Sequence, residues 1–85
     1  MPYIKPQRRL ELDPLVQPLL NSAWELQPGD LNYVITRIVH AVWAVDKAYY
    51  MGNALMGVCS CVAAEFYRTM LAPYEDTKRA ENGDV

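Results

Sequence analysis

The sequence predicts an all-α protein: a short first helix and a long antiparallel helical hairpin, with an extended N-terminal arm and a polar C-terminal tail. Two observations lead to this fold class. Apolar residues recur at three- and four-residue spacing over segments that are too long for ordinary strands. Helix-breaking and helix-capping residues separate these segments, as they do between consecutive helices. At 85 residues the chain is expected to form a single domain.

The N-terminal part is predicted to be an arm followed by a short helix. Residues 1–12 show no sustained helical period, so we expect an ordered arm or a strap there. Asp13 and Pro14 begin the first helix, predicted over residues 13–26. An aspartate accepts hydrogen bonds from the free amides of a first turn, and a proline fits the first helical position. Pro18 removes one backbone hydrogen bond and should bend or loosen the early turns.

The second helix is predicted over residues 30–50, after the breakers Pro28 and Gly29 and the capping residue Asp30. Its apolar residues alternate four and three apart, which is typical of a helix packed nearly antiparallel against a partner. They are Leu31, Ile35, Ile38, Val42, Val45 and Tyr49. Several β-branched residues make a buried strand the rival interpretation, but the segment exceeds the usual length of strands.

The third helix is predicted over residues 53–72, after a turn at 50–53. Pro73 should end it, because a proline inside a helix lacks an amide donor and clashes with the preceding turn. Residues 73–85 are then a polar tail with room for one or two helical turns. The helix carries an apolar face (Leu55, Val58, Cys59, Val62, Phe66 and Met70) and a strip of small residues (Gly57, Ser60, Cys61 and Ala64).

Charge and hydropathy argue against two classes of partner. The formal net charge is −2 and the basic residues are scattered, so nothing indicates binding to nucleic acid or to an acidic membrane. No uninterrupted apolar segment approaches the roughly 20 residues that span a bilayer, and no secretory leader precedes the domain. We therefore expect a cytoplasmic protein with reduced cysteines.

The sequence contains no pattern typical of a catalytic or metal site. His40 is the single histidine, and Cys59 and Cys61 lack the spacing of metal ligands. A thiol in apolar surroundings has a raised pKa and reacts poorly. We expect His40 to be a core or interface residue and the cysteines to be structural, and we expect no enzyme activity, no cofactor and no metal.

Polar residues are predicted to meet at one end of the hairpin. A hairpin that pivots near Met51 places Arg37 near Glu65 and Tyr33 near Thr69. Free amides and the helix dipole at the start of helix two favour an anion. The alternative is an Arg37–Glu65 ion pair that merely fixes the register of the hairpin. The candidate ligand-binding residues are Asn32, Tyr33, Thr36, Arg37, Glu65, Tyr67, Arg68, Tyr74, Lys78 and Arg79.

Four sequence blocks together resemble a family of small uncharacterised proteins of tailed phages and prophages, a domain of unknown function. The blocks are Met-Pro-Tyr-Ile-Lys-Pro at 1–6, Gly-Asp-Leu-Asn-Tyr-Val-Ile-Thr-Arg at 29–37, Glu-Phe-Tyr-Arg at 65–68, and residues 72–84. The resemblance covers nearly the whole chain and implies a phage setting but no mechanism.

Small phage proteins without enzymatic signatures commonly act by binding, which leads to two hypotheses. The first is a homo-oligomeric counter-defence protein of the host cytoplasm that sequesters a small anionic, nucleotide-like signal without turnover. The second is an adaptor or inhibitor that docks a host or phage protein through an exposed helix face. Both rest on a surplus of apolar helix surface, since 52% of the residues are hydrophobic.

Overall fold

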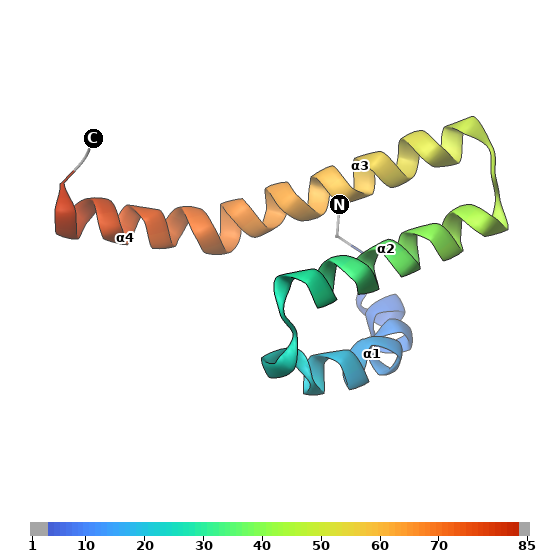
Figure 1. The fold of residues 1–85 in the computed structure, drawn as a ribbon, viewed down its shortest axis with the longest axis horizontal. Coiled ribbons are helices and arrows are strands. Elements are labelled where there is room, and N and C mark those ends of the chain that lie inside the picture. The colour runs from blue at the N-terminus through green and yellow to red at the C-terminus, as the bar shows by residue number, and fades with distance from the viewer. Residues whose placement is uncertain (1–3, 84–85) are drawn as a thin grey trace.

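The computed structural model describes residues 4–83, and every regular element in that range is a helix (Figure 1). The elements are α1 (Pro6–Asn21), a short 3₁₀ helix η1 (Ala23–Glu25), α2 (Pro28–Val45), α3 (Tyr49–Phe66), a π-helical turn η2 (Tyr67–Leu71) and α4 (Ala72–Asn82). The last three elements form one continuous helix of 34 residues, Tyr49–Asn82. The predicted all-α class is confirmed.

The N-terminal helix begins at Pro6 rather than at Asp13, so most of the expected arm at 1–12 is helical; residues 1–3 lie outside the described range. Pro6 occupies an early position where its missing amide costs nothing. The Nε atom of Arg9 donates to the carbonyl of Ile4 at 2.9 Å and holds the start of the helix. Pro14 and Pro18 lie inside α1, where each removes a backbone hydrogen bond, and the ribbon changes direction within this helix (Figure 1).

The second helix starts at Pro28, two residues before the predicted start, and ends at Val45 instead of residue 50. At its start the amide of Gln27 donates to the carboxylate of Asp30 at 3.0 Å. At its end Asp46 is extended, with φ −147° and ψ 98°, and its carboxylate accepts a hydrogen bond from the hydroxyl of Tyr50 across the loop. A carboxylate at a helix C-terminus is disfavoured by the dipole. The turn therefore lies at 46–48, earlier than predicted.

The long helix runs through Pro73 instead of ending there. Immediately before it the helix widens into the π turn of η2, in which the amide of Ala72 donates to the carbonyl of Tyr67 five residues earlier. This wider turn lets the chain pass Pro73, which lacks an amide and would clash in a regular α-helix. Residues 73–82 of the expected polar tail are consequently helical. Residues 84–85 of that tail lie outside the described range.

The helices form an open arrangement. α2 and α3, which follow one another in the chain, are antiparallel and in contact within the described range. The contact lies near the loop, where a Cβ atom on Gly52 would be 3.4 Å from Cζ3 of Trp43. α4 continues past the start of α2 (Figure 1). No described side chain is buried, and the radius of gyration is 16.3 Å, against about 12 Å for a compact chain of this length.

The long helix also passes a simple test for membrane-spanning segments. By length and composition, Tyr49–Asn82 is one helix of the described range that could cross a bilayer. This differs from the expectation that no segment is long and apolar enough to span a bilayer. Core helices of soluble proteins pass the same test, so the finding assigns no membrane.

Candidate functional site

Three of the predicted site residues line one groove at the start of α2. Asn32, Tyr33 and Thr36 surround an open groove of about 500 Å³ together with Pro28 and Gly29. The first turn of a helix offers unpaired backbone amides and the positive end of the dipole. In this helix Asp30 places a carboxylate in the same turn. An anionic group would therefore be attracted further along the helix, towards Arg37, which lies about two turns beyond Asp30.

Arg37 is held in position by its own helix. Its Nη1 atom donates to the hydroxyl of Tyr33 at 3.1 Å, and the guanidinium carbon lies 5.8 Å from the centre of the Tyr33 ring. The hydroxyl of Thr36 donates to the amide oxygen of Asn32 at 3.3 Å. These four residues form two pairs at i,i+4 spacing, which makes them neighbours on the helix surface. The sequence therefore predicted correctly that they share one part of α2.

The predicted Arg37–Glu65 ion pair is wrong for the described residues. Glu65 pairs with Arg68 at 2.5 Å within the long helix, and Arg37 bonds to Tyr33. Because the turn is at 46–48, Trp43 rather than a later residue faces Gly52. The same register puts Arg37 level with Val58. This Arg37–Glu65 pair was the register-fixing alternative to a ligand site, so that alternative is wrong for the described residues as well.

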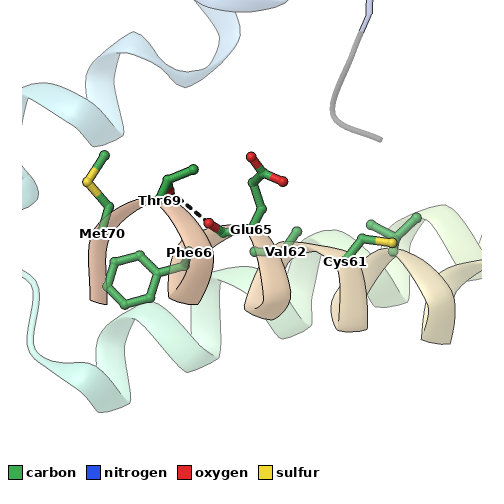
Figure 2. Close-up of a pocket in the computed structure, with 7 residues that line it drawn as sticks. Cys61, Val62, Glu65, Phe66, Thr69 and Met70 are labelled. Carbon is green, nitrogen blue, oxygen red and sulfur yellow. Dashed lines mark hydrogen bonds between the residues drawn. The ribbon is translucent and has the colours of Figure 1, made fainter. Parts of the chain in front are cut away.

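The remaining predicted residues lie on the long helix and are mostly paired within it. The start of α2 is level with the part of this helix around Phe66, and α4 extends beyond it (Figures 1 and 2). Tyr74, Lys78 and Arg79 belong to α4 and so are not gathered around the α2 groove. Lys78 pairs with Glu81 at 3.3 Å and lies 5.6 Å from the Tyr74 ring, and Arg79 pairs with Asp76 at 3.4 Å.

A second groove, of about 350 Å³, follows the long helix. It is lined by Val58, Cys61, Val62, Glu65, Phe66, Thr69 and Met70. Figure 2 shows Glu65, Thr69 and Met70 projecting to the same side of the helix, with the hydroxyl of Thr69 donating to the carbonyl of Glu65 at 2.8 Å. The sequence placed most of these residues on a packed face. In the chain they are exposed, and the surplus of apolar residues was the signal for such a surface.

His40 and the cysteines contribute no cluster of reactive groups. His40 and Cys59 line a third groove, of about 310 Å³, between α2 and α3. Both cysteines are free and exposed, so the expectation of thiols surrounded by apolar side chains is not met. Within residues 4–83, no group of three or more His, Cys, Asp or Glu residues is placed to hold a metal ion.

Tyr67 spans the π turn. Its hydroxyl donates to Oε1 of Glu75 at 2.7 Å, eight residues further along the helix. This hydrogen bond, followed by the negative charge of Glu75, raises the pKa of Tyr67 above its ordinary value of 10.0. Since the folded state then holds the phenolic proton more tightly than the unfolded state, the resulting stability is complete below pH 10 and is lost as the pH rises through the folded-state pKa.

We expect Tyr67→Phe to lower the thermal midpoint by a few degrees or less at pH 8, because it removes one exposed hydrogen bond. The difference from the wild type should shrink as the pH is raised above 10, where the wild-type tyrosine ionises. Thermal melts followed by circular dichroism between pH 8 and 11 measure both effects. Tyr74→Phe is the matched control, and an equal response of the two variants would contradict the prediction.

The family comparison matches residues 1–85 to a domain of unknown function, DUF6899. The chain belongs to this family. The predicted resemblance to a family of unknown function is thereby confirmed over the whole chain. No curated protein and no solved structure matches the chain. Membership of DUF6899 names no reaction, ligand or partner.

Proposed function

We propose that this chain is a binding protein that holds a small anionic, nucleotide-like ligand at the start of α2 without turning it over. The observation that carries the proposal is the Tyr33–Arg37 pair beside the open groove. A guanidinium group has five N–H donors in a fixed plane, and the bond to Tyr33 engages one of its terminal nitrogens. The other donors are available to a phosphate oxygen.

The neighbouring groups suit the rest of a nucleotide. Tyr33 is 61% exposed, so the part of its ring that Arg37 leaves open can stack on a planar base. Asn32 and Thr36 supply an amide and a hydroxyl on the same helix face, which can bond to a sugar or to a base edge. The carboxylate of Asp30 disfavours a second anionic group in the first turn.

The residues that line the groove support a proposal of binding without turnover. They are Pro28, Gly29, Asn32, Tyr33 and Thr36. This set contains no histidine, carboxylate or thiol to act as a general base or as an activated nucleophile. We therefore propose sequestration, and the phage-like sequence blocks at 29–37 and 65–68 support a counter-defence role in a host cytoplasm, with a signalling nucleotide as the ligand.

The test is a thermal melt of the purified chain against a panel of cyclic and linear nucleotides. A ligand that binds only the folded state raises the midpoint in proportion to the logarithm of its concentration. We expect Arg37→Gln to weaken binding of the active nucleotide by at least about tenfold, the effect of losing one charge-assisted hydrogen bond. Arg8→Gln, at an exposed arginine paired with Glu11, should bind like the wild type.

Two results would contradict the proposal. One is the absence of a shift with any nucleotide at millimolar concentration. The other is an equal shift for Arg37→Gln and the wild type, which would place the ligand elsewhere on the chain.

A second candidate function is an adaptor or inhibitor that docks a host or phage protein. It is favoured by the exposed apolar side chains of the N-terminal region, where Leu15 is 74% and Trp24 is 82% exposed. Exposed aromatic residues are common anchors in protein interfaces. Stable co-purification with one specific protein, without any nucleotide response, would favour this function over the first.

A further inference from the structure

The exposed surface of the chain is too large for a folded protein of its size. The accessible area is 7,473 Å² for a mass of 9.7 kDa. A compact monomer of this mass exposes about 5,100 Å². The excess is about 2,400 Å² per chain by the same relation, and none of the described side chains is buried. A single chain therefore provides helices without a core.

Part of the exposed apolar surface lies along one side of the long helix. Val58, Val62, Phe66 and Met70 follow one another at four-residue spacing and define the Val58–Met70 face. All four side chains are exposed, Val62 to 60%. Another side of the same helix, with Gly52, Leu55 and Cys59, lines the groove shared with α2. The Val58–Met70 face is thus not covered by α2 in the hairpin.

We infer that a second copy of this chain covers the Val58–Met70 face across a two-fold axis. The two hairpins then share one helical bundle whose core lies between the chains. A standard interface buries about 800 Å² on each partner, and permanent homodimers bury about 2,000 to 5,000 Å² in total. The excess over the whole chain is larger than the area that a standard interface buries on each partner, and the Val58–Met70 face is one part of it. This inference does not depend on the proposed ligand.

Two features favour a second copy over other partners. Glu65 lines the same groove as Phe66 and Met70, and its carboxylate is paired with Arg68. A lipid contact would place this ion pair in hydrocarbon, which is costly, whereas a protein interface accommodates it at its edge. A chain without a core of its own has no stable folded monomer, as in obligate homodimers. A second copy is present wherever the chain is synthesised.

The oligomeric mass of the purified wild-type chain is the primary test. Light scattering at tens of micromolar should give a multiple of 9.7 kDa. Val62→Lys places an ammonium group in the interface, so we expect at least a hundredfold weaker association and loss of the helical signal as monomers form. Val45→Lys is the matched control: it is the same substitution at a valine 87% exposed at the end of α2, and it should assemble like the wild type.

The native cysteines provide a second measurement that does not require a destabilised variant. Cys61 lines the groove of the Val58–Met70 face, whereas Cys59 lines the α2–α3 groove. Cys59→Ser, which keeps Cys61, should form a covalent dimer with a short bis-maleimide. Cys61→Ser should remain a single chain under the same conditions.

Three outcomes would overturn the inference. A helical wild-type chain of 9.7 kDa would show that the face needs no cover. A chain that becomes helical only with lipid vesicles, or only with a different protein, would assign the face to that partner. Cross-linking through Cys59 but not Cys61 would place the contact between copies on another side of the long helix.

Discussion

Replacing Trp43 with alanine is expected to lower the free energy of unfolding by about 3 kcal/mol, the lower end of the range for large aromatic residues. Trp43 is half-buried and lies against Gly52, where α2 and α3 meet. A Cβ atom added at Gly52 would be in van der Waals contact with the indole ring, so the two helices are close together at this point. Removing the ring takes away a contact between the two helices close to the loop, so the hairpin should open as well as lose stability.

Trp24→Ala is the matched control, because Trp24 is 82% exposed in η1 and an exposed side chain contributes little. We expect a change within about 0.5 kcal/mol. Urea unfolding at one fixed protein concentration, followed by circular dichroism and tryptophan fluorescence, measures both variants. A loss for Trp24→Ala as large as that for Trp43→Ala would mean that the assembled protein covers Trp24, and the ranking of the two tryptophans would then be wrong.

The parts of the fold that local sequence determines were predictable. The spacing of apolar residues identified α2 and α3. The capping residue Asp30 predicted the start of α2 to within two residues. The end of α2 was not predictable in this way, because the apolar period continues through Tyr49. The helix stops at Val45 since Asp46 is extended and bonds to Tyr50, a side-chain contact that no periodicity reveals.

Prolines misled the sequence interpretation at two places. Pro14, expected at the first helical position, lies inside α1, and Pro73 lies inside a helix that was expected to stop there. A proline is compatible with either outcome, depending on whether the preceding turn can widen. The π turn at Tyr67–Leu71 has a different period from an α-helix, so a search for regular spacing does not detect it.

The candidate site was predictable within one helix and not between helices. The relation of Tyr33 to Arg37, and of Asn32 to Thr36, follows from their four-residue spacing on α2. The relation of Arg37 to Glu65 depends on where the hairpin turns. A shift of the turn to residues 46–48 moves every cross-helix pair by about two helical turns, which separates Arg37 from Glu65.

Pro73→Ala is expected to stabilise the long helix by up to about 3 kcal/mol, the cost of a proline inside a helix relative to alanine. Alanine restores an amide that can donate to the carbonyl of Thr69, so the π turn is free to relax to the α-helical form. To the extent that the π turn already relieves the clash at Pro73, the gain in the free energy of unfolding is smaller than about 3 kcal/mol. Guanidinium unfolding followed by circular dichroism measures it.

The same substitution should rotate α4 about the helix axis. In a regular α-helix, residues eight apart lie about 80° apart around the axis, so Tyr67 and Glu75 would not meet. The π turn closes this angle and allows their hydrogen bond. When Pro73→Ala removes the π turn, the bond should break and the pKa of Tyr67 should fall back towards its ordinary value, which an ultraviolet titration of the tyrosines detects.

The control for this rotation is Pro28→Ala. Pro28 is at the start of α2, where a proline costs almost nothing, so that variant should change neither stability nor the titration. If Pro73→Ala lowered stability and left the titration of Tyr67 unchanged, the π turn would be fixed by other contacts of η2. Accommodation of Pro73 would then not be the reason that the helix widens before it.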